Sequence, residues 1–424
     1  MIRLYTFIMS LLIAAGYPLS LILALFGKNY MRDRFLPPSG LPENGSRRVW
    51  IHAASVGESG IAFSLATEIR KCYPESIVFV STITATGLER IRAMNRASDA
   101  PPVAASFLAP FDHPIITKRF LRTVAPTSFI LVETELWPWL VLSMKKRDVP
   151  VTVVNGKISK RAFRRYMVIR RMMAPIVECL SLVCVQNRSF AKRFHLLGVP
   201  RNSIEIVGNV KFDGLPVASD YDREKIRADL GIDAGLKIFV AGSTRPGEEE
   251  VLVAAFGIIL EAHSDTVLVL APRHLNRLAE VVRILDHNGV SYTKRSDADS
   301  RPEAGGVLLL DTMGELIQAY AAADAAFVGG SLSDFGGHNP LEPAALGVPV
   351  VFGHYMEQTG SKELLNDGAA ILVHDRDELA GAVIGIFDME KKIETMKEAG
   401  PIVVGRFKGT LARTIRMMGE RSFL

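Results

Sequence analysis

Cysteine is scarce in this sequence, and the few cysteines form no recognisable pattern. Cys72, Cys179 and Cys184 are the only three in 424 residues. An odd number with no short paired spacing argues against a disulfide framework and against a zinc site, and it is typical of a reducing compartment. No cluster of His, Cys and carboxylate side chains has the spacing of metal ligands, so we expect no essential metal and no other cofactor.

Familiar nucleotide and nucleic-acid signatures are also missing. The chain has no GxxxxGK[ST] loop, and no GxGxxG opens its first strand–helix unit, which argues against a Walker-type NTPase and a dinucleotide-dependent dehydrogenase. We find no recognition helix and no basic, aromatic-interleaved strand, so we expect no nucleic-acid partner. The composition, 48% hydrophobic over 424 residues, is that of a folded protein of two or three domains.

Acidic residues are scarce in the first half only. Residues 1–210 hold 28 Lys/Arg and 13 Asp/Glu, a balance of +15, whereas residues 211–424 hold 22 and 32, a balance of −10. Such an asymmetry indicates different partners for the two halves. The basic half suits an anionic surface, such as lipid headgroups or a phosphorylated substrate.

Residues 4–27 form a long run without a charged side chain. A helix needs about 20 apolar residues to cross a bilayer core, so the run is long enough. The basic residues that follow are Lys28, Arg32, Arg34, Arg47 and Arg48. This flank places the rest of the chain on the cytoplasmic side. We expect a membrane anchor over residues 1–28, with a signal peptide or a buried core helix as alternatives. Gly16 and Pro18 leave open whether it spans the bilayer or dips in and returns.

After this segment, short apolar runs alternate with helical patterns, which predicts βαβ units and parallel sheets. Expected strands are Val49–Ala53, Ile77–Thr82, Phe129–Val132, Val151–Asn155, Lys237–Ala241, Val267–Ala271, Gly306–Leu310, Ala325–Val328 and Val348–Phe352. Expected helices include Gly57–Lys71, Ala85–Arg96, Pro114–Thr123, Trp137–Arg147, Glu248–His263, Leu275–Asn288, Met313–Ala322, Pro340–Leu346 and Leu379–Lys392.

A break at Gly208–Pro216 divides the alternation into two parts. We therefore expect two doubly wound, Rossmann-like α/β domains, over residues 29–210 and 211–424, with the last helix a candidate to return to the first domain. Open parallel sheets bind ligands beyond the carboxyl ends of their strands. Two such domains facing each other would place the site in the cleft between them.

The first candidate site is Ile51–Gly60, where a strand runs into a helix. Small residues there let a ligand approach the backbone. Glu58 would lie in the first turn of the helix, either as a general base or only as an acid that complements the helix dipole.

The second candidate is Phe327–Phe352, where glycine pairs precede a helix start. Asn339 is expected as the N-cap and Pro340 as the first helical residue. Exposed N–H groups and the helix dipole would suit a nucleotide phosphate, and Glu342 could accept hydrogen bonds from a ribose. An ordinary capped helix after a glycine-rich turn is the alternative.

Three other strand ends carry candidate ligand groups. Arg273, in APRH, could pair a phosphate. Ser243 and Thr244 could donate to phosphate at a helix start, with the three following glutamates mainly as dipole partners. Asp311–Glu315 could offer backbone groups to a base, and Glu133–Pro138 sets two acids and Trp137 where they could bind sugar hydroxyls, or where Trp137 only packs.

Seven basic residues without an intervening acid follow: Lys157, Lys160, Arg161, Arg164, Arg165, Arg170 and Arg171. The spacing of the first five predicts one basic helical face. A solvated face is the common reading of such a run, but the missing acids favour an anionic partner, phosphate or bilayer.

Together these segments resemble the Kdo (3-deoxy-manno-octulosonic acid) transferases of lipid A biosynthesis, which have the GT-B fold. The matching stretches are ASVGES, ETELWP, NGKISKRAFRRY, GNVKFD, AGSTRPGEEE, APRH, DTMGEL and FVGGSLSDFGGHNPLEPAALGVPV. They extend from the apolar segment to about residue 355. Departures from the family's usual pattern are Lys157, Arg245, the stretch SLSDFGG and the run after Gly353.

The resemblance implies roles for individual residues. Glu58 matches the proposed catalytic base. The segments that match CMP-binding positions are Pro272, Arg273, Met313, Gly314, Glu315, Asn339, Pro340, Leu341 and Glu342. We expect Ser243, Thr244, Gly336, Gly337 and His338 near the donor phosphate and sugar. We expect the acceptor at Ser55, Gly57, Lys157, Lys160, Arg161, Arg164 and Arg165.

The expected reaction is transfer of Kdo from CMP-Kdo to a lipid A precursor, with inversion and release of CMP. The expected place is the cytoplasmic side of the inner membrane of a Gram-negative bacterium. The alternatives are a GT-B enzyme that uses a UDP- or GDP-sugar, a nucleotide-sugar epimerase, and a non-catalytic nucleotide-binding membrane adaptor.

Overall fold

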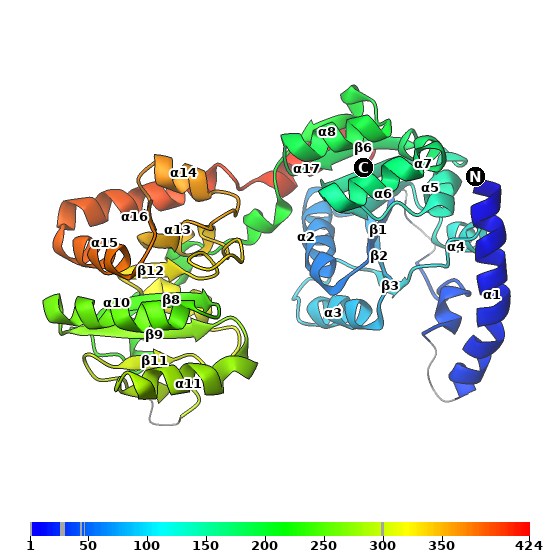
Figure 1. Cartoon of the computed structure of the whole chain (residues 1–424). Coiled ribbons are helices and arrows are strands. Elements are labelled where there is room, and N and C mark those ends of the chain that lie inside the picture. The colour runs from blue at the N-terminus through cyan, green and yellow to red at the C-terminus, as the bar shows by residue number, and fades with distance from the viewer. Residues whose placement is uncertain (1, 26–29, 43–44, 46, 298–300) are drawn as a thin grey trace. The chain divides into compact units, whose positions relative to one another are not determined.

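The computed structural model describes residues 2–25, 30–42, 45, 47–297 and 301–424, and it divides the chain into two compact units. The first unit contains Met1–Asp213 and Gly409–Leu424, and the second contains Gly214–Lys408. Each unit is built on its own sheet, and the C-terminal helix belongs to the first unit (Figure 1).

The first unit has a seven-stranded parallel sheet in the order β3-β2-β1-β4-β5-β6-β7. Its strands are β1 (Arg48–Ala53), β2 (Ile77–Thr82), β3 (Ala105–Leu108), β4 (Ser128–Val132), β5 (Val151–Gly156), β6 (Leu180–Val185) and β7 (Ile204–Ile206). Its helices are α1 (Ile2–Leu25), α2 (Val56–Cys72), α3 (Ala85–Arg96), α4 (Pro114–Val124), α5 (Pro138–Lys145), α6 (Lys160–Val168), α7 (Arg170–Val177), α8 (Arg188–Leu197) and α17 (Thr410–Glu420).

Side chains that alternate along the strands build a core on each face of this sheet. On β1, Trp50 points to the core beneath α4, α5, α7 and α8, and Ile51 points to the core beneath α2, α3 and α17. Both residues are fully buried. A sheet covered on both faces by helices is the doubly wound arrangement.

The second unit repeats this plan with the strand order β10-β11-β9-β8-β12-β13-β14, again all parallel. Its strands are β8 (Lys237–Thr244), β9 (Thr266–Pro272), β10 (Tyr292–Lys294), β11 (Val307–Leu309), β12 (Ala325–Val328), β13 (Val350–Gly353) and β14 (Ala370–Val373). Its helices are α9 (Arg223–Asp229), α10 (Glu248–Ala262), α11 (Leu278–His287), α12 (Leu316–Ala322), α13 (Leu341–Ala345), α14 (Ser361–Asn366), α15 (Arg376–Asp388) and α16 (Glu390–Gly405).

The prediction of two doubly wound parallel α/β units is confirmed. Several elements differ from the expectation. The helix expected over Met313–Ala322 begins only at Leu316, and the helix expected over Leu379–Lys392 is two helices that meet at Met389. The strands β3, β6, β7, β10 and β14 were not anticipated; β3, β10, β7 and β14 are short edge strands with weak patterns.

Helix α1 covers most of the uncharged segment, as its sequence predicted. It lies beside α4 in the first unit (Figure 1). The hydroxyl of Tyr5 donates to Asp112 Oδ2 at 2.8 Å, and the indole of Trp139 donates to Thr6 Oγ1 at 2.9 Å. Residues 26–29, at the end of the expected anchor and including Lys28, lie outside the described residues. Within the described part of the chain, no helix is both long enough and apolar enough for a bilayer crossing.

The basic flank expected next to the bilayer is largely used inside the first unit. Arg34 is buried and donates to Ala109 O at 2.9 Å, and Arg48 is buried and donates to Val124 O at 2.9 Å. Arg47 pairs with Glu75. These three residues therefore do not form the cationic flank from which orientation was inferred. The charge pattern alone could not distinguish them from exposed arginines.

Candidate functional site

The strand at the topological switch point of each sheet marks the candidate site in that unit. In the second unit, β8 lies between β9 and β12, and in the first unit β1 lies between β2 and β4. At such a switch point the chain connections leave in opposite directions, which opens a crevice beyond the strand's carboxyl end. The predicted site residues follow these strands.

Glu248, the first residue of α10, occupies the glycine loop beyond β12. Its buried carboxylate accepts the backbone N–H groups of Gly330 (2.6 Å), Ser331 (2.9 Å), Leu332 (2.9 Å) and Arg245 (2.9 Å). The Gly329–Leu332 turn therefore binds an anion that the chain supplies itself. This corrects the expectation that the N–H groups of the first glycine pair are open to a phosphate, and it gives Glu248 a structural role beyond the helix dipole.

Thr244 is also engaged within the fold. Its hydroxyl is fully buried and donates to Glu249 Oε1 at 2.9 Å, and Glu249 in turn accepts Arg277 Nη1 at 2.8 Å and Nη2 at 3.2 Å. This corrects the expectation that Thr244 donates to a ligand phosphate. The preceding residue, Ser243, has a left-handed backbone with φ of 59°, a conformation that non-glycine residues rarely adopt and that is enriched at functional sites.

The second glycine pair leads into a short helix. The N–H of Gly337 donates to Gly330 O at 2.6 Å and that of His338 donates to Gly329 O at 3.0 Å, which folds the loop back on itself. Helix α13 has five residues, and its N-cap is Pro340, one residue later than expected. The dipole of so short a helix is small, so side chains must supply most of any attraction for a phosphate.

Asn339 and Glu342 form the helix start. Asn339 Oδ1 accepts the N–H of Leu341 at 3.2 Å, and its Nδ2 donates to Glu342 Oε1 at 3.1 Å. Burial raises the pKa of Glu342, against the opposing effects of Asn339 and of the nearby Arg273 charge. Leu341 is fully buried and belongs to the packing, so only its backbone can contact a ligand.

Arg273 is exposed immediately after Pro272, at the end of β9. Among the described residues no carboxylate lies within ion-pair distance of its guanidinium. At the end of the neighbouring β11, Met313 is 76% exposed and Gly314 has a left-handed φ of 92°. Glu315 accepts Arg295 Nε at 3.0 Å. The side chains of Arg273 and Met313 are thus accessible to a ligand, whereas that of Glu315 is already paired with Arg295.

In the first unit, Glu58 and Ser55 form a variant of the capping box at the start of α2, in which Glu58 reaches the N–H of Ala54 and not that of the N-cap Ser55. Ser55 Oγ accepts the N–H of Glu58 at 3.4 Å and donates to Glu58 Oε1 at 3.0 Å. Glu58 Oε2 accepts the N–H of Ala54 at 2.7 Å, and the residue is 8% exposed. Glu58 can therefore hold the helix start and also act as a general base, because a carboxylate oxygen that accepts one hydrogen bond keeps a second lone pair.

Two further acids lie at the end of β4. Glu133 has a left-handed φ of 63° and pairs with Lys157 at 2.6 Å. Burial, with the negative charges of Glu58 and Glu133, raises the pKa of Glu135. The carboxyl groups of Glu135 and Glu58 are therefore close enough to affect each other electrostatically. The sequence indicated this only by placing both acids after expected strands.

The basic run divides into two helices at Ile169, and all seven of its cationic side chains are exposed. Lys157 precedes the Ser159 N-cap of α6 and is paired with Glu133, so it does not belong to the helical face on which the spacing placed it. Phe163 and Tyr166 pack against the core, which turns the basic side of α6 outward. No described group of three His, Cys, Asp or Glu side chains could hold a metal ion.

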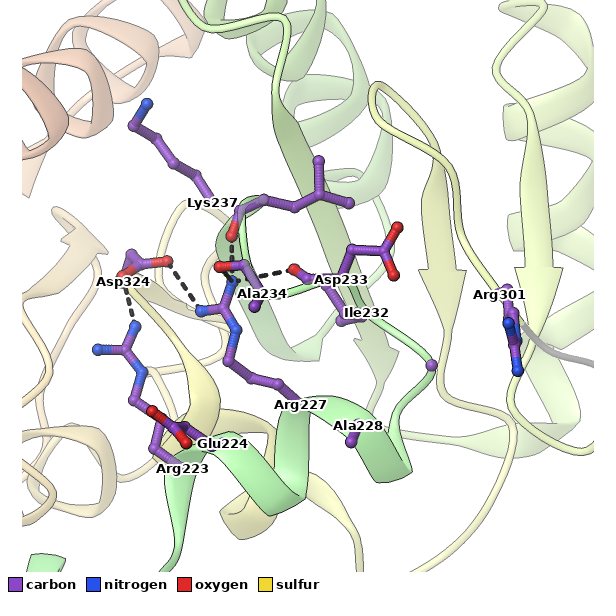
Figure 2. A pocket seen from close by; sticks show the side chains of 12 residues that line it. Arg223, Glu224, Arg227, Ala228, Ile232, Asp233, Ala234, Lys237, Arg301 and Asp324 are labelled. Carbon is purple, nitrogen blue, oxygen red and sulfur yellow. Dashed lines mark hydrogen bonds and ion pairs between the residues drawn. The ribbon is translucent and has the colours of Figure 1, made fainter.

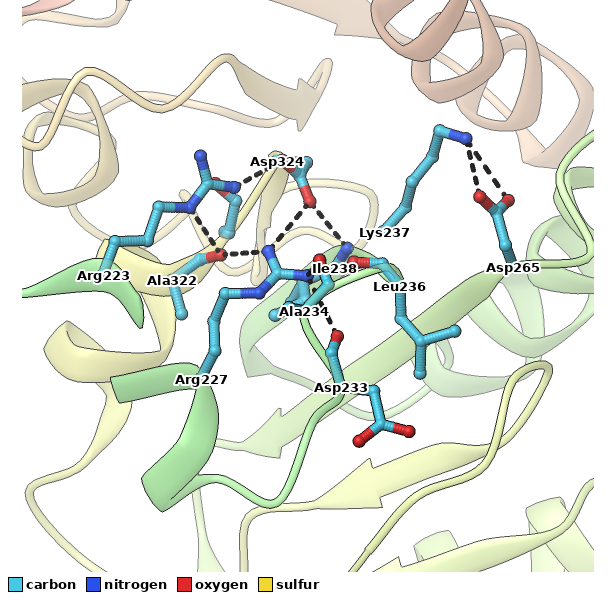
Figure 3. Close-up of polar contacts among 11 residues, drawn as sticks. Arg223, Arg227, Asp233, Ala234, Leu236, Lys237, Ile238, Asp265, Ala322 and Asp324 are labelled. Carbon is cyan, nitrogen blue, oxygen red and sulfur yellow. Dashed lines mark hydrogen bonds and ion pairs between the residues drawn. The ribbon is translucent and has the colours of Figure 1, made fainter. Parts of the chain in front are cut away.

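A hollow of about 800 Å³ lies at the opposite ends of β8 and β12, away from the predicted residues. Figure 2 shows Arg223 and Arg227 directed at Asp324, and Arg227 Nη1 is 3.5 Å from Asp324 Oδ2. Asp324 also accepts the N–H of Ile238 at 2.9 Å, and Lys237 pairs with Asp265 at 2.9 Å (Figure 3). The pairs that Asp324 makes with Arg223 and Arg227 tie α9 to the sheet.

Comparison with known proteins gives a consistent result. Residues 29–214 match the family model described as 3-deoxy-D-manno-octulosonic-acid transferase (kdotransferase). The 3-deoxy-D-manno-octulosonic acid transferase of Haemophilus influenzae is 32% identical over 90% of this chain and 87% of its own. That of Chlamydia muridarum is 30% identical over 83% and 81%.

Solved structures with the same architecture have low sequence identity. A glycosyltransferase from Rickettsia africae has a TM-score of 0.60 at 12% identity, covering 88% of this chain and 98% of its own. A UDP-N-acetylglucosamine 2-epimerase has a TM-score of 0.59 at 14% identity, covering 90% and 98%. At such identities the likeness shows the fold alone. That fold is GT-B-like and contains two α/β units, each built on a parallel sheet.

Proposed function

This chain belongs to the 3-deoxy-D-manno-octulosonic acid (Kdo) transferase family of glycosyltransferases, and from that premise we propose that it transfers Kdo from CMP-Kdo to a lipid A precursor. The observation that carries the donor assignment is Arg273. Its guanidinium, which pairs with no carboxylate among the described residues, follows β9, next to the switch point, and its charge acts on Glu342. An arginine in this position can pair a phosphate in a bidentate manner, while Asn339 and Glu342 offer polar groups to a ribose.

The proposed step is a single inverting displacement. Glu58 removes the proton of an acceptor hydroxyl, whose oxygen forms a bond to the anomeric carbon of Kdo. The bond from that carbon to the phosphate oxygen breaks, and CMP leaves with the electron pair. Arg273 stabilises the charge that develops on the phosphate. No metal or other cofactor is part of the proposal.

The proposal for the acceptor-binding surface is based on its positive charge. Lys160, Arg161, Arg164 and Arg165 are exposed on α6, and the helix has no acidic residue. A lipid A precursor carries phosphates, so a basic helix in the same unit as Glu58 suits it. Ser55 and Gly57, at the start of α2, would border the acceptor hydroxyl.

Attachment to a membrane rests on α1. Its outward side chains Leu4, Phe7, Ile8, Leu11 and Leu12 are 47–62% exposed. They follow the i, i+3, i+4 spacing of one helical face. An exposed apolar stripe of this kind is suited to insertion into a bilayer. We place the enzyme at the cytoplasmic side of a Gram-negative inner membrane.

The test is transfer by the purified chain. Incubation with CMP-Kdo and a defined lipid A precursor should give a product whose mass has increased by Kdo units, with release of CMP. CMP should compete with the donor better than UDP or GDP. Transfer from a UDP- or GDP-sugar instead would favour the second donor class, and nucleotide binding without any CMP release would favour a non-catalytic adaptor.

A further inference from the structure

We propose that Arg245, held in place by His274 and His338, forms a carboxylate-binding subsite that makes the donor site selective for an acidic sugar. This inference rests on the proposed function, because it assigns a second anionic group of the same donor to a residue outside the nucleotide-binding set. It concerns a position that composition and spacing did not single out for ligand binding.

Three neighbours fix the guanidinium of Arg245. Its Nε donates to His338 Nε2 at 3.3 Å, and its Nη1 donates to His274 Nε2 at 2.8 Å. The guanidinium carbon lies 5.0 Å from the ring centre of Phe335, a cation–π contact. An arginine held in this way binds with little loss of side-chain entropy, which favours its use in recognition.

The two imidazoles act as acceptors in this arrangement. Arginine has no acceptor atom, so both Nε2 atoms must be unprotonated. Burial and the charges of Arg245 and Arg273 lower the pKa of His338 to about 4, with a smaller effect from His274. His338 therefore stays neutral at physiological pH. Arg245 keeps its whole positive charge and three further N–H groups on its terminal nitrogens.

No acid neutralises this charge. Among the described side chains, none with a carboxylate lies within ion-pair distance of Arg245 or Arg273. The adjacent Glu248 is committed to four backbone N–H groups, including that of Arg245 itself. Both arginines act on the pKa of His338, so both charges lie within electrostatic range of that imidazole. The site therefore presents two positive charges that form no ion pair with a carboxylate of the described residues.

Two charges exceed what a CMP phosphodiester needs. A phosphodiester linking a nucleoside to a sugar carries one negative charge, which one arginine can pair. The second charge suits a sugar that is itself an anion, and the acid function of a ulosonic acid is a carboxylate. A planar guanidinium matches a carboxylate through two parallel hydrogen bonds.

The surroundings favour Arg245 over Arg273 for the carboxylate. Arg273 acts on Glu342, which we assign to the nucleotide side. Arg245 lies against the glycine loop instead: a Cβ added at Gly330 would lie 3.5 Å from Arg245 Cγ and 3.2 Å from His338 Cδ2. The loop thus closes on Arg245 and leaves its terminal nitrogens for the part of the donor beyond the phosphate.

The experiment separates the two arginines with two ligands that share the nucleotide: CMP-Kdo, and CMP, which lacks the sugar and its carboxylate and carries a phosphomonoester. Arg245→Gln, Arg273→Gln and the exposed control Arg283→Gln on α11 are compared for KM and kcat with CMP-Kdo and for inhibition by CMP. We expect Arg245→Gln to raise KM for CMP-Kdo by roughly 10- to 100-fold, the range for a charge-assisted hydrogen bond, and to change the inhibition constant of CMP by less than about threefold. Arg273→Gln should weaken both ligands, and Arg283→Gln neither.

Equal weakening of CMP and CMP-Kdo by Arg245→Gln would assign Arg245 to the phosphate and overturn the proposal, as would no effect on either ligand. If Arg245→Gln does not fold, Arg245→Lys carries the test. It keeps the charge but loses the planar fork, so it should still weaken CMP-Kdo more than CMP. Failure of the proposed function would be seen separately, as a wild-type chain that neither binds CMP nor transfers Kdo.

Discussion

Glu58 accepts the backbone N–H of Ala54 through Oε2 at 2.7 Å, across the turn that joins β1 to α2. The residue that we propose as the general base is therefore also part of a helix cap. Replacing it alters both stability and chemistry unless the substitution keeps the cap. A capping box accepts glutamine as well as glutamate at this position, which provides a way to separate the two effects.

Glu58→Gln should lower kcat strongly and leave folding intact. The amide oxygen can still accept the Ala54 N–H, but it cannot take a proton, so we expect a loss of about 10²- to 10⁴-fold in kcat. Glu58→Ala should show the same loss and in addition destabilise the first unit by about 1 kcal/mol, the usual value of a lost cap. Transfer assays and urea unfolding measure the two effects.

Glu135→Gln is the matched comparison, because Glu135 is the acid whose pKa the charge of Glu58 raises. We expect its replacement to lower kcat much less than Glu58→Gln. The opposite order, with Glu58→Gln near normal and Glu135→Gln inactive, would move the role of the base to Glu135.

Glu248→Gln should destabilise the second unit. The carboxylate satisfies four N–H groups, and an amide would turn a donor toward some of them, so we expect a loss of at least about 3 kcal/mol. All three tryptophans, Trp50, Trp137 and Trp139, lie in the first unit. The loss should therefore appear in circular dichroism but not in tryptophan fluorescence during urea unfolding.

Glu250→Gln is the control for this prediction, because Glu250 lies in the same helical turn but is exposed. It should change the free energy of unfolding by less than about 0.5 kcal/mol. If Glu248→Gln were equally harmless, the buried carboxylate would not be what holds the glycine loop.

The fold was predictable because buried parallel strands are nearly continuous apolar runs with helical patterns between them. Ile77–Thr82 and Ala325–Val328 were predicted to the residue. Edge strands such as Tyr292–Lys294 were missed because three residues with one face open carry almost no pattern. The break at Met389 was missed since the apolar spacing continues through it.

The candidate site was predictable as a set of strand ends, but not as a set of free groups. Sequence placed Thr244, the glycine loop and Arg273 each at the carboxyl end of an expected strand. It could not indicate that Glu249 takes the hydroxyl of Thr244, or that Glu248 takes the N–H groups of the loop, because these contacts depend on side-chain burial. It likewise could not reveal that Arg245 has two imidazole partners and no ion-paired acid among the described residues.

His52 should make the stability of the first unit depend on pH. It is fully buried on β1, its Nδ1 lies 2.9 Å from Ser81 Oγ, and its Nε2 has no hydrogen-bond partner within the described part of the chain. Burial, with a smaller effect of Arg34, lowers its pKa from 6.5 to about 4. The unfolded chain therefore binds a proton below pH 6.5 that the folded chain refuses until about pH 4, and stability falls as pH falls through that window.

The expected loss between pH 7 and pH 5 is about 2 kcal/mol from this residue. Urea unfolding followed by tryptophan fluorescence measures it. In His52→Gln the difference between the two pH values should shrink by that amount, whereas in the exposed control His287→Gln it should match the wild type. An unchanged pH dependence in His52→Gln would mean that His52 is not neutral in the fold.

The outward stripe of α1 should determine binding to lipid vesicles. Leu11 and Leu12 are 56% and 61% exposed, whereas the hydrogen bonds of Tyr5 and Thr6 hold the helix to the unit. Burying a leucine side chain in an apolar phase is worth about 1.5–3 kcal/mol. Replacing both residues by serine should therefore weaken binding to vesicles of mixed neutral and anionic lipid by at least about 100-fold, as measured by sedimentation.

Membrane binding through the apolar stripe of α1 and through the basic face of α6 should respond differently to salt. Insertion of apolar side chains is insensitive to ionic strength, whereas attraction of Arg161 and Arg164 to anionic headgroups is screened within about 8 Å at physiological salt. Wild-type binding should persist in high salt and be lost in the double serine variant, while Ile402→Ser, an exposed apolar residue of α16 (62%), should bind normally. If the double serine variant binds as well as the wild type and only salt releases the chain, then α6 and not α1 makes the membrane contact.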